Sequence, residues 1–138
     1  MRQIQERMTV PGSRRKFTDL SEQLRKFVGS AGISTGLLTL FIQHSSASLL
    51  IQENADPNVL RDLEDAFARL APRTANYRHS TEGPDDMPGH IRSALTQTSL
   101  SIPVAGGKLL LGTWQAVYLF EHRDAPHDRS IIMHLMGE

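Results

Sequence analysis

Residues 77–95, YRHSTEGPDDMPGHIRSAL, concentrate side chains that can bind a metal or transfer protons. The stretch holds two histidines and three carboxylates, namely His79, His90, Glu82, Asp85 and Asp86. The chain has no cysteine, so imidazole and carboxylate are the available ligands for a metal such as Zn²⁺. The composition of this stretch therefore indicates metal binding or acid/base chemistry.

Three histidines are the candidate metal ligands: His44, His79 and His90. An open catalytic zinc site commonly uses three protein ligands and keeps one position for water or substrate. Spacing along the chain does not show that these side chains meet, and no His-x-x-x-His pair is present. The pattern leaves two interpretations open: a joint metal site, or three ordinary surface or capping residues.

Glu82, Asp85 and Asp86 are the candidates for acid/base work. Neighbouring carboxylates near histidines can hold different pKa values, and a carboxylate can also orient a ligating imidazole. The sequence PDDMP before a helix is equally what helix capping and the helix dipole favour. We expect a capping role for at least one of Asp85 and Asp86.

A second polar group follows a predicted strand and consists of Glu53, Asn54 and Asp56. Asp56 before Pro57 has the pattern of a helix N-cap followed by proline at the first helical position. Capping does not explain Glu53 and Asn54, which could bind a cation or a ligand hydroxyl.

Trp114, the only tryptophan, precedes Gln115 and follows Gly112, which allows a bulge or a close backbone approach. The pattern favours a core aromatic residue whose indole N–H is hydrogen-bonded. The functional alternative is a ring stacked on a flat substrate, with Gln115 as its polar neighbour.

The remaining histidines, His122, His127 and His134, are interpreted as surface or edge residues without a role. Arg123 and Arg129 could contact an anion, but solvated charge is the commoner outcome for such residues.

Several functions are disfavoured by the sequence. An adjacent His44 and Ser45 on one strand point to opposite faces, and no Gly-x-Ser-x-Gly elbow is present. No glycine-rich nucleotide motif occurs. Fifteen basic and fifteen acidic residues give zero formal net charge, which argues against capture of nucleic acid or an anionic membrane. No apolar run matches a signal peptide or a membrane span, so we expect a cytoplasmic protein.

The length of 138 residues predicts a single domain over residues 1–138. Periodicity predicts helices near residues 20–28, 57–70 and 88–95, and strands over residues 3–10, 37–43, 48–52, 99–104, 108–111, 114–123 and 130–136. Strands adjacent in sequence favour an α+β fold with mostly antiparallel sheets packed as a sandwich and about three helices.

Three long motifs resemble the YjbQ family, whose members are also described as secondary thiamine-phosphate synthases. The motifs are QHSSASLLIQENADPNV, YRHSTEGPDDMPGHIRSAL and SIPVAGGKLLLGTWQAVYLFEHR. Two departures from the family pattern are mild. Ser45 stands where the family commonly has threonine, and residues 116–119 read Ala-Val-Tyr-Leu in place of Gly-Ile-Tyr-Leu.

The resemblance implies a homotrimer with a polar pocket near the subunit interface. It implies a divalent metal (Zn²⁺, Mn²⁺ or Mg²⁺) and a weak thiamine-phosphate synthase activity on phosphorylated small molecules. The implied metal ligands are His44, His79 and His90. The implied catalytic residues are Glu53, Asn54, Asp56, Asp85, Asp86, Trp114 and Gln115.

We therefore expect the loop to bring His79, Asp86 and His90 into one pocket facing His44. Two alternatives to the synthase remain open: a metal-dependent hydrolase with Asp86 or Glu53 as base, and a non-catalytic metal- or ligand-binding trimer. The sequence shows no diphosphate cradle and no aspartate-rich magnesium motif.

Overall fold

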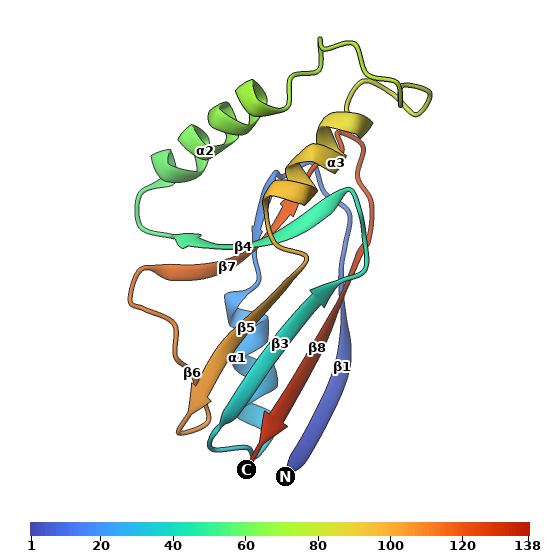
Figure 1. Cartoon of the computed structure of the whole chain (residues 1–138). Helices are drawn as coiled ribbons and strands as arrows, with labels where there is room; N and C mark the ends of the chain where they lie inside the picture. The colour runs from blue at the N-terminus through green and yellow to red at the C-terminus, as the bar shows by residue number, and fades with distance from the viewer.

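Two antiparallel sheets and three helices make up the fold in the computed structural model, which describes residues 1–138 (Figure 1). The strands are β1 (Arg2–Val10), β2 (Phe17–Asp19), β3 (Gly36–Ile42), β4 (Ala47–Glu53), β5 (Ser99–Ala105), β6 (Lys108–Leu109), β7 (Gln115–Glu121) and β8 (Arg129–Gly137). The helices are α1 (Ser21–Ser30), α2 (Pro57–Leu70) and α3 (Asp86–Leu95). The sheets have the strand orders β1-β8-β3-β5-β6 and β2-β7-β4. The predicted α+β fold is confirmed, and β2 is the element that the prediction missed.

One apolar core joins the two sheets and α1. Leu40 of β3, Leu49 of β4 and Ile131 of β8 are fully buried in it. Leu24 and Val28, one helical turn apart, bring the inner face of α1 into the same cluster. In Figure 1 this helix lies behind the five-stranded sheet. No helix of the chain combines the length and the apolar character needed to cross a bilayer.

The outer face of the five-stranded sheet carries apolar side chains. Only Leu38, Leu40 and Ile42 of β3 are buried, and the residues that alternate with them face outward. Leu37 and Phe41 are 41% and 48% exposed, and Met136, the cross-strand partner of Leu37, is 37% exposed. We call Leu37, Phe41 and Met136 the outer stripe.

Strand β7 is the central strand of the smaller sheet and is buried on both faces from Ala116 onward. Phe120 stacks on Phe17 of β2 with ring centroids 4.5 Å apart. The two ends of β7 lead into the two groups of polar residues that the sequence singles out, so this strand sets where those groups lie.

Helix α2 begins as predicted, because Oδ1 of Asp56 accepts the Asn58 N–H at 2.9 Å and Pro57 occupies the first turn. The inner face of this helix is only partly covered. None of its residues is fully buried, and Leu70 is 63% exposed. Figure 1 shows α2 standing away from the sheets at the same end of the molecule as α3.

Candidate metal centre

Helix α3 places Asp86 and His90 on one face, since residues four apart are neighbours on a helix. Nε2 of His90 lies 3.3 Å from Oδ2 of Asp86. The helix begins at Asp86, two residues before the predicted start at Pro88. The earlier start puts both residues on the same rigid element.

Asp85 stands at the N-cap position of α3, but its side chain makes no capping bond. Asp86 lies in the first turn with its oxygens bound to His79 and Arg123, so the capping role predicted for at least one of the two is wrong. Oδ2 of Asp85 instead accepts hydrogen bonds from Nε of Arg123 at 3.1 Å and from the backbone N–H of Asp124 at 2.9 Å. The carboxylate therefore fastens the start of α3 to the chain that follows β7.

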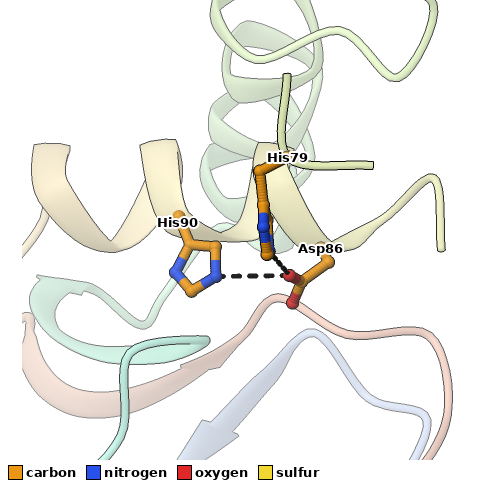
Figure 2. A group of neighbouring side chains, drawn as sticks. All are labelled: His79, Asp86 and His90. Atoms are coloured by element: carbon orange, nitrogen blue, oxygen red, sulfur yellow. Dashed lines mark hydrogen bonds and ion pairs between the residues drawn. The ribbon is translucent and has the colours of Figure 1, made fainter. Parts of the chain in front are cut away.

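His79 reaches Asp86 from the loop before α3. Its Nε2 lies 2.5 Å from Oδ2 of Asp86, the same oxygen that faces His90. The two imidazole rings lie edge to face with centroids 5.5 Å apart. One ligand atom from each residue falls within 4.8 Å of the other two (Figure 2). The structure thus brings His79, Asp86 and His90 together as expected.

Arg123 holds the opposite oxygen of Asp86. Its Nη1 donates to Oδ1 of Asp86 at 2.9 Å, and its Nη2 donates to the main-chain oxygen of Glu82 at 3.0 Å. Burial alone raises the pKa of the Asp86 carboxyl, but the hydrogen bond with His79 and the charges of His90 and Arg123 outweigh burial. The pKa lies below its ordinary 3.8. Asp86 is therefore a fixed anion, and Arg123 was wrongly expected to be a solvated charge.

A pocket of about 340 Å³ adjoins the exposed side of His79. The side chain of His79 is 43% exposed and that of His90 is 33% exposed, whereas Asp86 is 4% exposed. The pocket lining also includes Arg73, Asn76, Tyr77, Ser80, Met87 and Pro88. A small molecule in this pocket would contact the imidazole edge while the carboxylate stays covered.

Arg73 is the cationic residue of this pocket, and Asp124 binds it. Nη1 and Nη2 of Arg73 lie 2.7 Å and 2.5 Å from the two oxygens of Asp124. The hydrogen bond from Arg73 lowers the pKa of Asp124 to about 2. Both side chains are about half exposed, so water weakens the pair.

His44 lies in a different network of the chain. Its Nε2 accepts the Ser130 N–H at 2.8 Å, and its Nδ1 is 3.4 Å from Nη1 of Arg129. Burial and the charge of Arg129 lower the pKa of His44. Arg129 itself is buried and bound to Glu121, so its expected solvation was wrong. His44 is not among the three grouped residues, and its role as a metal ligand stays a prediction.

His122 is buried at 2% exposure, so its assignment to the surface was wrong. Its Nε2 lies 2.9 Å from Oγ of Ser48, which accepts a hydrogen bond from Thr96 at 2.6 Å. Burial, aided by the charge of Arg92, lowers the pKa of His122 to about 3. A Cβ on Gly89 would lie 3.2 Å from Cβ of His122, so this glycine lets α3 rest directly on the end of β7.

The second polar group lies at the start of β7. Glu53 is the register partner of Gln115 across the β4–β7 pair, and the Asn54 N–H donates to the main-chain oxygen of Trp114 at 2.9 Å. Oε2 of Glu53 accepts the backbone N–H of Asp56 at 3.3 Å. The structure therefore brings Glu53, Asn54, Asp56, Trp114 and Gln115 together.

Trp114 is 63% exposed, so the favoured prediction of a core aromatic residue is wrong. Gln115 uses its Oε1 to accept the Gly112 N–H at 2.7 Å, which closes the turn before β7. This turn presents the indole ring to solvent, where it is free to stack on a partner.

The two polar groups lie at opposite ends of one strand. β7 runs from Gln115 to Glu121, and a strand advances roughly 3.3 Å per residue, which separates its ends by about 20 Å. Within one chain the expected catalytic residues therefore form two sites, with Asp85 and Asp86 beside the histidines and the others at the far end.

A family model described as "UPF0047 protein YjbQ-like" matches residues 6–138. The chain belongs to the YjbQ family. Among YjbQ relatives, UPF0047 protein sll1880 of Synechocystis sp. is 52% identical over 138 residues, which cover 99% of this chain and 94% of that protein. UPF0047 protein YjbQ of Escherichia coli O157:H7 is 42% identical over 135 residues, covering 97% and 98%. The resemblance inferred from the motifs is confirmed.

Solved structures support the same YjbQ assignment. The crystal structure of an uncharacterized YjbQ/UPF0047 protein from Clostridium acetobutylicum has a TM-score of 0.84 at 33% identity, covering 96% of this chain and 99% of that chain. A protein of unknown function from Sulfolobus solfataricus has a TM-score of 0.90 at 22% identity, covering 99% of both chains, and bears on the fold alone.

Proposed function

We propose that this YjbQ-family chain is a metal-dependent enzyme whose divalent ion binds to His79, Asp86 and His90. The observation that carries the proposal is the approach of their three ligand atoms to within 4.8 Å of one another. Two imidazole nitrogens and a carboxylate oxygen suit Zn²⁺, Mn²⁺ or Fe²⁺. The part-exposed rings leave the pocket side accessible to water and substrate.

One spacing between the donor atoms already fits such an ion. Zinc bonds of about 2.0–2.2 Å hold neighbouring donors roughly 3.3–3.5 Å apart in a tetrahedral site. Oδ2 of Asp86 and Nε2 of His90 are 3.3 Å apart. His79, at 2.5 Å from the same oxygen, is within hydrogen-bonding distance of it and must retreat by about 1 Å to reach that spacing. Metal binding therefore competes with the His79–Asp86 hydrogen bond and weakens in acid.

The surrounding residues suit hydrolysis of a small phosphorylated substrate. A bound divalent ion supplies Lewis acidity and lowers the pKa of a bound water. Arg123 keeps Asp86 ionised and in place. Arg73 on the pocket wall attracts an anionic group of the substrate.

Thiamine-phosphate synthase activity is a second candidate, which the same Arg73 favours. Joining hydroxymethylpyrimidine diphosphate to thiazole phosphate releases pyrophosphate, whose charge requires a cation. The leaving group would displace Asp124 from Arg73. Rescue of a thiamine-requiring strain at native expression, lost in His79→Ala, supports this candidate. If the strain is rescued only by overexpression, the synthase activity is incidental to the protein's role. If it is not rescued at all, the synthase candidate is rejected.

We also propose that the chain forms a homotrimer. In it, the polar group at the end of β7 in one subunit meets the polar group at the start of β7 in the next subunit. The outer stripe supports assembly, because a row of exposed apolar side chains on a sheet face favours contact with another copy. Light scattering measures the mass. A trimer that dissociates in Phe41→Glu, but not in the Leu110→Glu control, supports the proposal. A wild-type monomer contradicts it.

Metal content of untagged protein tests the main proposal. Wild type should carry one ion per chain, lost in His79→Ala and His90→Ala and retained in the matched control His134→Ala. The metal content of His44→Ala shows whether His44 binds the same ion. The absence of metal from folded wild type supplied with Zn²⁺ or Mn²⁺ would overturn the proposal. If the protein binds metal but hydrolyses no phosphate ester in a panel, it is a metal-binding protein and the proposal that it is an enzyme is overturned.

A further inference from the structure

A second hollow lies between α1 and the turn that joins β5 to β6. Figure 1 shows this region at the opposite end of the molecule from α3, so the hollow is separate from the histidine group. It has two compartments of about 490 Å³ and 270 Å³, and Gly29 and Gly107 line both. The larger compartment is completed by Arg25, Lys108 and Leu109. We call the two compartments together the glycine groove.

Gly29 has no structural reason to be glycine. It lies within α1, where glycine is a poor helix former, and its φ is not positive. A Cβ placed on it would meet nothing within 4 Å, so no close contact excludes a side chain. By contrast, Gly107 has φ +71° and is required by the turn. The effect of glycine at position 29 is to keep the groove open.

The rim of the larger compartment is basic. Arg25 and Lys108 line it from opposite sides, one on α1 and the other on β6. Arg2 does not line either compartment, but its Nη1 and Nη2 donate to the main-chain oxygens of Gly32, which lines the smaller one, and of Ala31, at 2.7 Å and 3.1 Å. The lining of the larger compartment is mostly carbon, because helix backbone, Leu109 and the stems of the two basic side chains form it.

We propose that the glycine groove binds a small organic anion with an apolar body. The anionic group lies between Arg25 and Lys108, and the apolar body lies over Gly29 and Gly107. Carbon-rich walls with two charged groups at one edge match the usual division of a ligand site, in which apolar contact provides affinity and a few polar groups fix orientation. The proposal is independent of the metal site.

Two fluorescent probes with closely related ring systems test it: 8-anilinonaphthalene-1-sulfonate, an anion, and N-phenyl-1-naphthylamine, which is neutral. Titration of folded wild type should show saturable binding of both, with the sulfonate tighter. Gly29→Leu fills the groove, so binding of both probes is lost while the melting temperature stays equal or rises. Gln23→Leu, which adds the same side chain to α1 outside the groove, leaves binding unchanged.

The charged rim is tested by the double variant Arg25→Gln/Lys108→Gln. Sulfonate binding should weaken by about tenfold, the effect of losing roughly one charge-assisted hydrogen bond, with the neutral probe unchanged. No saturable binding to the wild type, or binding that survives Gly29→Leu, overturns the site. Equal weakening of both probes in the double variant overturns the preference for an anion.

Discussion

The two ends of β7 hold their polar side chains in place by different means. At the end of the strand, Arg123 binds Asp85 and Asp86, which lie 38 and 37 residues earlier in the chain. At its start, Asp56 and Gln115 bond to backbone groups two and three residues away. The first arrangement exists only in the folded molecule, whereas the second is a property of local sequence.

Burial differs between the two ends in the same way. Asp86 and His122 are 3% and 2% exposed, whereas Trp114 is 63% exposed. Charged and polar groups out of water depend on their partners far more than exposed groups do. Substitutions at the end of β7 should therefore lower the free energy of unfolding more than substitutions at its start.

Acid should destabilise the fold most through His122. With a pKa of about 3 when folded and an ordinary value of 6.5, this residue takes up a proton in the unfolded chain first. The contribution of His122 to the free energy of unfolding is fully present above pH 6.5. About 2–3 kcal/mol of it is lost by pH 4.5, and about 4 kcal/mol by pH 3. Urea unfolding between pH 7 and 4.5 measures the slope, which should flatten in His122→Phe. The lowered pKa of His44 adds a smaller slope of the same sign in both proteins. An unchanged slope contradicts the assignment.

Removing Arg123 should cost about 3 kcal/mol in the free energy of unfolding, because Asp86 keeps its charge out of water without the partner of its Oδ1. The matched variant Arg73→Met breaks the half-exposed pair with Asp124 and should cost less than about 1 kcal/mol. Chemical denaturation of Arg123→Met and Arg73→Met gives both values. Equal losses would mean that burial does not distinguish these pairs.

Zn²⁺ should stabilise the protein through the histidine end alone. At 100 times the dissociation constant the gain is about 2.7 kcal/mol, seen as a rise in melting temperature that EDTA reverses. Asp86→Asn removes the anionic ligand and with it the rise. Glu53→Gln changes a carboxylate at the other end of β7 and should keep the rise. Loss of the zinc effect in both variants would show that the two ends act as one site.

The smallest effects belong to the start of β7. Asp56→Ala removes the N-cap of α2 and should cost about 1 kcal/mol. Trp114→Ala should change stability by less than about 0.5 kcal/mol, because its ring has little contact to lose. Thermal unfolding of both variants checks this order. A loss above about 2 kcal/mol for Trp114→Ala would mean that the ring is covered, as it would be in an assembly.

The sequence predicted what depends on neighbouring residues. The Asp56-Pro57 start of α2 follows from hydrogen bonds within one turn, and the strand and helix types follow from periodicities of two and 3.6 residues. The grouping of His79 with His90 was expected only together with the family resemblance, since their separation on a loop and a helix fixes no distance.

The same sequence patterns do not predict contacts between residues that are far apart in the chain. Arg123 and His122 stand in a charged stretch that resembles a solvated turn. Only the packing of α3 against the end of β7 buries His122 and brings Asp85 and Asp86 to Arg123. Asp85 has the position of a cap, but its carboxylate is taken by a partner 38 residues later. His44 has its nitrogens directed to the start of β8, a contact between residues 86 positions apart.

The position of β8 also determines when the larger sheet can form. β8 follows every other strand in sequence yet lies between β1 and β3, with Arg2 opposite Gly137. During translation, β1 has no partner and β3 keeps one open edge until β8 leaves the ribosome. Unpaired strand edges invite pairing with other nascent chains, and such distant contacts form slowly. Pairing within this sheet therefore waits for β8, and the edges of β1 and β3 that β8 covers stay open to other chains until that strand has been synthesised.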